Sequence, residues 1–414
     1  ININVRRLGG SYGAKLSRNT QIACACAVAA HVLNRPARFI MTIESNMSSI
    51  GKRFPVSHEY EIGVDEEGVI QYLNQTSWHN YGSSLNDPNV GEAINFSFSC
   101  YDKSVWSSVG YTARTDLPHN TYCRAPGSTE GIAMAENMLE HIAQALGKDP
   151  VDVRLKNMNS TDKGPLSKMI TDIKNTSDYD ARVAAVNMFN RENRWKKRGI
   201  SLIPMKYSLQ TGGPWNALVT VYPRDGTVAV LHGGVEVGQG INTKIAQVTA
   251  HTLGLDLDMI SVKPTNNLVA PSNAVTGGSI STECAANATI AACNTLLERL
   301  EPVKKKLGNP TWKELVFAAY GDNVNLCVQT MLSANGAEGY PIYGVGVSEV
   351  EVDVLTGQHI IRRVDILEDA GISMNPEIDR GQVEGAFVMG IGYWTSEDLM
   401  YDPHTGVLVN NRTW

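Results

Sequence analysis

Apolar residues recur along the chain with two different spacings, and each spacing predicts one type of element. Between residues 127 and 146 they fall every three or four positions, as in a helix with one buried face, and Ser128 stands where an N-cap is expected. The same reasoning predicts helices at residues 17–33, 150–157, 180–195, 243–253, 283–300 and 381–394. Alternating apolar and polar residues, interrupted by glycine-containing turns, predict hairpins at residues 58–77, 217–232, 349–367 and 399–410.

These strands and helices are interleaved without the regular alternation of a doubly wound sheet, which favours an α+β fold with mixed sheets and packed helices. The polar, turn-rich stretch 159–178 is the best candidate for a boundary. We therefore expect two related lobes, residues 1–165 and 166–414. The first residues read like the middle of a strand and the last lack a helix stop, so both ends are expected to be cut from a longer protein.

The composition is that of a globular protein with a large core. Hydrophobic residues make up 43% of the chain and charged residues 19%, with a net charge of −6. No basic run exceeds three residues, as at 304–306, so nothing indicates nucleic-acid binding. No apolar stretch is long enough to span a bilayer.

Cysteines and histidines give no sign of a protein-ligated metal. The seven cysteines include no Cys-x-x-Cys pair, which excludes a zinc or thioredoxin signature and favours buried free thiols in a reducing compartment. Cys24 and Cys26 lie in an alanine-rich run and are expected in the core. The helical histidines lack a second histidine four positions later, so metal ligation is not indicated.

Four glycine-rich segments carry the candidate chemistry: residues 9–15, 124–128, 238–240 and 276–281. Their backbone amides and serine hydroxyls suit phosphate and pterin oxygens, especially before a helix. The first segment is not a Walker loop, because Lys15 follows Ala14 and Leu16 replaces the hydroxyl residue. Together, loops from distant parts of the chain indicate a large phosphate-bearing cofactor lying between two lobes.

Six segments, in this order, resemble the xanthine dehydrogenases and aldehyde oxidases: residues 6–15, 124–127, 234–241, 276–279, 346–351 and 381–387. The resemblance covers the whole chain and implies most of the molybdopterin-binding portion of such an enzyme. It implies that the Tyr12–Gly13 backbone and Arg124 lie near the molybdenum ligands, and that Gln239 hydrogen-bonds an oxo ligand or the pterin. The remaining cofactor contacts that it implies are Gly278, Ser279, Ser281 and Gln382.

The resemblance also implies features of the complete enzyme. FAD and two 2Fe-2S clusters are expected in a part N-terminal to this chain, and the enzyme is expected to be a cytoplasmic homodimer. Molybdenum is expected to be held through molybdopterin, with no direct protein ligand in this region. The chemistry implied is hydroxylation with water as the oxygen source, a glutamate as general base, and O2 as the final electron acceptor.

Two positions depart from the purine-oxidising members of this family. Leu16 stands where they carry a glutamate that binds the heterocycle, and Pro126 stands where they carry a phenylalanine that packs on it. A purine facing Leu16 would leave polar groups unpaired at about 1–3 kcal/mol each, roughly ten- to hundredfold in discrimination. Their second substrate-binding arginine has no match in residues 89–100. The residues therefore favour an aldehyde oxidase, similar to the insect enzymes, whose small-molecule substrate is an odorant or pheromone aldehyde.

Two alternatives stay open at this point. One is a xanthine dehydrogenase-like purine hydroxylase with an unusual pocket. The other is a cofactor-free structural or interaction module on the same fold, against which the presence of Arg124, Gln239 and Ser279 argues.

The general base has no candidate in this chain. The family carries its glutamate in a Gly-Glu-Pro segment, and Glu92 and Glu384 stand in other contexts. The base is therefore expected beyond residue 414, and the isolated chain is expected to be inactive.

Overall fold

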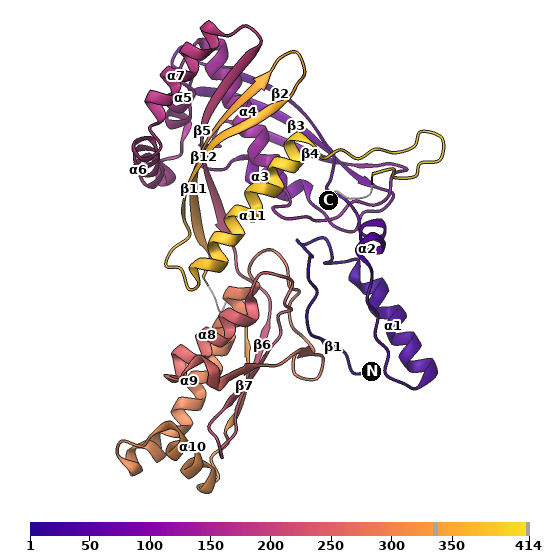
Figure 1. Cartoon of the computed structure of the whole chain (residues 1–414), viewed down its shortest axis with the longest axis vertical. Helices are drawn as coiled ribbons and strands as arrows, with labels where there is room; N and C mark the ends of the chain where they lie inside the picture. Colours follow the sequence, from indigo (N-terminus) through magenta and orange to yellow (C-terminus); the bar gives the residue numbers. More distant parts are fainter. Residues whose placement is uncertain (334–337, 411–414) are drawn as a thin grey trace. The chain divides into compact units, whose positions relative to one another are not determined.

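The computed structural model describes residues 1–333 and 338–410 (Figure 1). The chain forms two compact units, each assembled from separate stretches of sequence. The first unit comprises residues 1–52, 209–340 and 373–414, and the second unit comprises residues 53–208 and 341–372. Both contain mixed sheets with packed helices, which confirms the predicted α+β class. The contiguous lobes 1–165 and 166–414 remain a prediction about cofactor binding, distinct from these packing units.

The first unit is built on a four-stranded sheet of order β10-β6-β7-β8, in which only β7 and β8 are parallel among the neighbouring pairs. Its strands are β6 (Trp215–Val221), β7 (Val228–His232), β8 (Ile260–Val262) and β10 (Cys327–Leu332). Helices that pack with this sheet are α8 (Ile241–Leu253), α9 (Ser281–Leu307) and α10 (Trp312–Gly321). Trp215, Ile245 and Leu296 are fully buried in the resulting core.

Smaller elements complete the first unit. A two-stranded sheet joins β1 (Asn4–Val5) to β9 (Thr265–Asn266), and a 3₁₀ turn, η1, spans Leu257–Met259. The other helices are α1 (Asn19–Leu33), α2 (Ile43–Ser49) and α11 (Pro376–Thr395). Neither α1 nor α11 has a buried residue within the described structure. The prediction that Cys24 and Cys26 lie in the core is therefore wrong: Cys24 is exposed and Cys26 is half-buried, because the alanine-rich helix that carries them packs too little surface to cover them.

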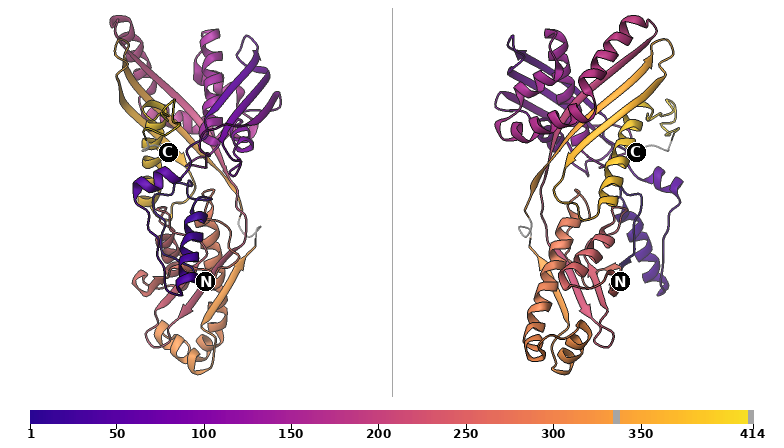
Figure 2. Two further views of the ribbon diagram at one scale, coloured as in Figure 1. Left: turned by 90° about the vertical axis from the view of Figure 1, so that its right-hand side faces the viewer. Right: turned by 60° about the vertical axis from the view of Figure 1, so that its left-hand side comes forward.

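The second unit contains two three-stranded sheets, of order β2-β3-β4 and β12-β11-β5. Its strands are β2 (Val56–Val64), β3 (Ile70–Gly82), β4 (Trp106–Arg114), β5 (Lys196–Leu209), β11 (Tyr340–Asp353) and β12 (His359–Asp369). The long antiparallel hairpin of β11 and β12 runs as two orange-to-yellow ribbons side by side (Figure 2). The helices are α3 (Val90–Ser97), α4 (Ser128–Leu146), α5 (Pro150–Asn157), α6 (Ser160–Thr176) and α7 (Tyr179–Glu192).

Residues 159–178, expected to be turn-rich, are mostly helical, because α6 spans Ser160–Thr176; the boundary expected within them remains a prediction. Asn159 caps α6, since its Oδ1 accepts from the backbone amides of Thr161 and Asp162 at 3.0 and 2.9 Å. Four buried apolar residues at helical spacing attach it to the core: Leu166, Met169, Ile170 and Ile173. The polar composition hid this face because the residues between them, Ser167, Lys168, Thr171 and Asp172, are polar.

The second unit contains one network of buried, paired charges around Arg154. Arg154 is fully buried, and its Nε lies 2.7 Å from Glu136 Oε2 while its Nη2 lies 2.9 Å from Glu140 Oε1. Tyr101 donates its hydroxyl to Glu136 at 2.5 Å. Such a network tolerates burial only while every member keeps its partner.

Across the described parts of the chain, no helix combines the length and the apolar character needed to cross a membrane.

Candidate functional site

Three of the four glycine-rich segments meet in the first unit. The amide of Leu8 donates to the carbonyl oxygen of Glu236 at 2.7 Å, which ties the first segment to the 238–240 loop. The amide of Val235 donates to Thr276 Oγ1 at 2.9 Å, which ties this loop to the 276–281 segment. Leu16, which directly follows the first segment, packs against the 276–281 segment, because a Cβ added at Gly277 would lie 3.1 Å from Leu16 Cδ1. Sequence stretches more than 200 residues apart thus form one cluster of loops.

The backbone of these loops is held in the left-handed region. Tyr12 and Gly13 have φ of +48° and +89°, and Gly278 and Ser279 have φ of +64° and +61°. This conformation costs a non-glycine residue about 1–2 kcal/mol, and runs of such residues shape anion-binding concavities. Nothing lies within 4 Å of where a Cβ would stand on Gly13 or Gly278, so the backbone there is open to a ligand.

The 238–240 loop is locked by the side chain of Glu236. Its Oε1 accepts from the amides of Gly238 and Gly240 at 2.9 and 3.1 Å, and its Oε2 accepts from Asn242 at 3.2 Å. Helix α8 begins at Ile241, so this carboxylate occupies the positive N-terminal end of α8. The expectation that a cofactor anion binds at this helix start is therefore not supported by the local structure.

Gln239 is fixed within the same loop. Its Oε1 accepts from the amide of Val237 at 2.7 Å, and its Nε2 donates to the carbonyl of Val235 at 3.1 Å. A side-chain amide has two N–H groups, so this arrangement leaves one N–H of Gln239 directed away from Val235. The structure thus sets the orientation in which Gln239 would meet a ligand.

Helix α11 packs beside the start of α8. Ile378 lies against Gly240, and Lys244 Nζ lies 2.8 Å from Asp379 Oδ1. Gln382 is exposed on α11, one turn beyond Asp379. Within the first unit, the structure therefore brings the α11 segment to the same loops as Gln239.

The 124–128 segment lies in the second unit and is considered there alone. Arg53 is buried, and its Nη1 donates to the carbonyl oxygens of Cys123 and Arg124 at 3.0 and 2.8 Å. Ala125 has a φ of +58° and Pro126 is half-buried. The guanidinium of Arg53 thus fixes the backbone of this loop through two hydrogen bonds.

The start of α4 differs from its sequence-based expectation. Gly127, with a φ of +75°, is the N-cap, and Ser128 is the first helical residue and makes no capping bond. The reason is close packing with α3, since a Cβ on Gly127 would lie 2.8 Å from the amide nitrogen of Ala93. One turn later, a Cβ on Gly131 would lie 2.3 Å from the carbonyl oxygen of Ala93. The apolar face that predicted this helix is mostly buried, at Ala135, Met138, Leu139 and Ile142, and its last residue, Leu146, is exposed.

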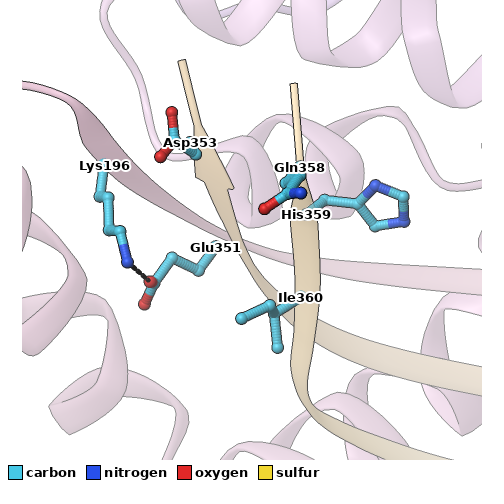
Figure 3. Close-up of a pocket in the computed structure, with 6 residues that line it drawn as sticks. All are labelled: Lys196, Glu351, Asp353, Gln358, His359 and Ile360. Atoms are coloured by element: carbon cyan, nitrogen blue, oxygen red, sulfur yellow. Dashed lines mark ion pairs between the residues drawn. The ribbon is translucent and has the colours of Figure 1, made fainter. Parts of the chain in front are cut away.

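A surface cavity of the second unit is lined by none of the predicted site residues. Among the described residues, no group of three or more His, Cys, Asp or Glu side chains is arranged to hold a metal ion. A cavity of about 350 Å³ lies at one end of the β5-β11-β12 sheet (Figure 3). Its Glu351 is engaged by Arg198 at 2.9 Å and by Lys196 at 3.9 Å, and no predicted site residue lines it.

Comparison with known proteins decides the family. A profile described as the molybdopterin cofactor-binding domain matches residues 172–414, and a second profile with the same description matches residues 1–158. The chain belongs to the molybdopterin-binding domains of the xanthine dehydrogenase/aldehyde oxidase family. The family that the six motif segments resemble is thereby confirmed.

Relatives of the molybdopterin-binding domain include both kinds of enzyme. Over 96% of its length the chain is 35% identical to a xanthine dehydrogenase of Drosophila subobscura, and over 100% it is 36% identical to a probable aldehyde oxidase 2 of Oryza sativa subsp. japonica. It spans 32% of each of these proteins, about a third of their length. A CO dehydrogenase structure from Oligotropha carboxidovorans has the same fold, with a TM-score of 0.86 at 20% identity over 99% of this chain and 58% of that one.

The loops of the first unit fit the group that this family binds. Molybdopterin presents phosphate and pterin oxygens, and the open left-handed backbone at Gly13 and Gly278 lets amides approach them closely. Ser279 is exposed beside Gly278, while Ser281 is buried at the start of α9. These residues would hold the cofactor, and Gln239 would add a side-chain amide.

Two residues that support the glycine-rich segments, Glu236 in the first unit and Arg53 in the second, were not predicted from the sequence. Glu236 had a usable signal, because an acidic residue shortly before a helix start is favoured by the helix dipole. Arg53 had none, since 70 residues separate it from the carbonyl of Cys123 that it holds.

Proposed function

We propose that this chain is the molybdopterin-binding portion of an aldehyde oxidase, which oxidises aldehydes to carboxylic acids with oxygen taken from water. The observation that carries the proposal is the environment of Leu16. Its half-buried apolar side chain packs against Gly277, within the loop cluster that would hold the cofactor. An aldehyde needs no polar partner at this position, whereas a purine does.

The size of this effect follows from desolvation. Each buried polar group left unpaired costs about 1–3 kcal/mol, so one lost partner disfavours a purine roughly ten- to hundredfold. Pro126, where purine-oxidising members carry a stacking phenylalanine, removes a flat contact surface as well. The names of two relatives agree with an aldehyde substrate: the probable aldehyde oxidase 2 of Oryza sativa subsp. japonica and an indole-3-acetaldehyde oxidase of Zea mays, 36% and 34% identical.

The residues of this chain would bind and orient. When bound, the molybdenum cofactor supplies the oxidising centre and the activated oxygen. The backbone at Tyr12 and Gly13, together with Arg124, would lie near the metal ligands. Gly278, Ser279 and Ser281 would cradle the phosphate or pterin, and Gln382 would add a pterin contact. The locked side chain of Gln239 would donate one N–H to the cofactor.

The remaining machinery would lie in the rest of a longer protein. We infer a general-base glutamate beyond residue 414, and FAD and two 2Fe-2S clusters in a part N-terminal to this chain. The complete enzyme would be a cytoplasmic homodimer that passes electrons to O2, and the isolated 414-residue chain would be inactive. Odorant or pheromone aldehydes would be its substrates.

The test is substrate oxidation by the full-length native enzyme, with a long-chain aliphatic aldehyde and xanthine compared under oxygen. We expect aldehyde turnover and negligible xanthine turnover. Strong xanthine turnover would instead assign the chain to a purine hydroxylase, the alternative that the Drosophila subobscura relative supports. Absence of molybdenum from the purified protein would contradict both and favour a cofactor-free module.

A further inference from the structure

Polar contacts attach the N-terminal end of helix α11 to helix α8 within the first unit. None of the described residues of α11 is buried, so apolar packing contributes little to its attachment. On α8, Lys244 Nζ lies 2.8 Å from Asp379 Oδ1. One turn along α8, Gln247 Oε1 accepts from Asn375 Nδ2 at 3.0 Å. Both contacts reach the first turn of α11 or its cap.

The first turn of α11 also contacts the 238–240 loop. Gly240 has a φ of +76°, and a Cβ there would lie only 2.6 Å from Ile378 Cδ1, so Ile378 fills the space beside this glycine. Asn375 caps α11, and its Oδ1 accepts from the amide of Ile378 at 3.1 Å. Gln239 directly precedes Gly240 in the loop. A movement of the first turn of α11 would therefore act directly on the loop that carries Gln239.

The ion pair of Lys244 with Asp379 lies next to this contact. Asp379 follows Ile378, and the amide of Lys244 donates to the carbonyl oxygen of Gly240 at 3.1 Å. The side chain of Lys244 is 16% exposed and that of Asp379 is 42% exposed, so water screens the pair only in part. Burial raises the pKa of Asp379, but hydrogen bonds from Lys244 and Ser373 outweigh this effect and hold the pKa below its ordinary value. Asp379 is therefore ionised at neutral pH.

We propose that Lys244 and Asp379 are positioning residues, whose ion pair holds Ile378 against Gly240 and so keeps the 238–240 loop in the shape that retains molybdopterin. The cofactor is the one named by the family profile that matches residues 172–414, which include α8 and α11. The inference rests on the part of the proposed function that assigns Gln239 to the cofactor. It applies to an aldehyde and to a purine substrate alike.

The test reverses each charge in the full-length, molybdenum-loaded enzyme, alone and together, as Lys244→Glu, Asp379→Lys and the double variant. Each single variant places two like charges face to face, which is unfavourable. We expect each single variant to lose molybdenum during dialysis roughly fivefold faster than the wild type, or more. The double variant should recover about half of this difference or more, because opposite charges meet again while the dipole of α11 disfavours a lysine in its first turn.

A control pair lies in the same unit, outside every segment that we assign to the site. Lys306, near the end of α9, has its Nζ 3.1 Å from Asp322 Oδ2. Lys306→Glu introduces the same reversal of charge between a lysine and an aspartate. It should leave the rate of molybdenum loss at the wild-type value.

Hydrogen exchange separates positioning from general destabilisation. Peptides covering residues 236–245 and 374–386 should exchange faster in both single variants and regain protection in the double variant, while peptides of β6 keep wild-type exchange. Wild-type rates of molybdenum loss in both single variants would overturn the proposal. Faster exchange spread evenly over the first unit would overturn it too, as would a double variant that loses molybdenum as fast as the single variants.

Milder variants keep the proposal testable if the charge-reversed single variants do not fold. Lys244→Met and Asp379→Asn remove the attraction without creating a pair of like charges. We expect both to lose molybdenum roughly two- to fivefold faster than the wild type, since the pair is only partly buried. Wild-type rates of loss in both would overturn the proposal equally.

Failure of the proposed function gives a different result. Strong xanthine turnover would reassign the substrate and leave the role of the ion pair unchanged. Wild-type molybdenum retention in the charge-reversed variants would remove that role and leave the aldehyde substrate unchanged. If the wild-type protein lacked molybdenum, the proposed function would fail, and the hydrogen-exchange comparison would still decide whether the ion pair holds the loop.

Discussion

Replacing Glu236 by alanine tests whether this carboxylate organises the loop that carries Gln239. The side chain accepts three backbone amides, those of Gly238, Gly240 and Asn242, at 2.9 to 3.2 Å. Losing a side-chain cap costs about 0.5–2 kcal/mol, and losing a negative charge at a helix N-terminus costs about 0.3–1 kcal/mol more. Glu236 is only half-buried, so water replaces part of what is lost. We therefore expect about 1–2 kcal/mol of local destabilisation.

The assay is hydrogen exchange in the full-length protein, followed in peptides that cover residues 236–245. Each 1.4 kcal/mol corresponds to about a tenfold change in an equilibrium constant, so protection of the three amides should fall roughly five- to thirtyfold. Glu236→Gln should give a smaller loss, because the amide oxygen still accepts while its NH2 group opposes a backbone N–H. Molybdenum content should decrease in the same order as protection.

Glu314 supplies the control for Glu236. It completes a capping box at the start of α10, where its Oε2 accepts from the amide of Thr311 at 2.8 Å. Glu314→Ala should loosen the start of α10 by a similar amount and leave molybdenum content unchanged. Unaltered exchange at Gly238 and Gly240 in Glu236→Ala would refute the reasoning that this carboxylate holds the loop.

Three further changes probe other parts of the chain. Leu16→Glu should lower kcat/KM for an apolar aldehyde by roughly tenfold or more, since a carboxylate replaces an apolar contact; equal kcat/KM would remove Leu16 from the pocket. Arg154→Met should destabilise the second unit by about 3–5 kcal/mol in denaturant unfolding, because it leaves the Glu136 carboxylate buried and unpaired, and adding Glu136→Leu should recover much of this loss. Burial lowers the pKa of fully buried His79 to about 4, below its ordinary value of 6.5. Between these two values the unfolded chain binds a proton at His79 and the folded chain does not, so the contribution of neutral His79 to the free energy of unfolding is present above pH 6.5 and is lost as the pH falls toward 4. The difference corresponds to at most about 3 kcal/mol, and His79→Phe should weaken the dependence of the unfolding midpoint on pH between 7 and 4.5; parallel profiles would contradict this assignment.

The elements that sequence analysis predicted well are those with local signals. The hairpin of β2 and β3 turns where expected because Asp65 Oδ1 accepts from the amides of Glu67 and Val69, and Gly68 takes a φ of +81°. Helix α8 ends at Leu253 because Gly254 adopts the left-handed conformation that closes a helix. Every one of these determinants lies within a few residues of the element that it ends or turns.

The elements that sequence analysis missed depend on distant partners. Strand β10 pairs with β6 through residues more than 100 positions apart, such as Val328 and Val219, and no local sequence pattern predicts that register. The contacts of the candidate site likewise join residues that are distant in the sequence. The glycine-rich loops were found by composition, but the bond from Leu8 to Glu236 and the packing of Leu16 on Gly277 exist only after the chain has folded.

The structure also separates two helix starts that look equivalent in the sequence. Both α8 and α9 follow a glycine-rich segment, and the helix dipole makes the N-terminus of each favourable for binding an anion. At α8, the carboxylate of Glu236 already accepts from the first amides, so a second negative charge there would be repelled. At α9, the acidic residue of the first turn, Glu283, instead accepts from the hydroxyl of Tyr340 at 2.7 Å. The open, left-handed turn at Gly278 precedes this second helix start. The anionic group of the cofactor is therefore expected at the start of α9, and the loop before α8 is left to contribute the side chain of Gln239.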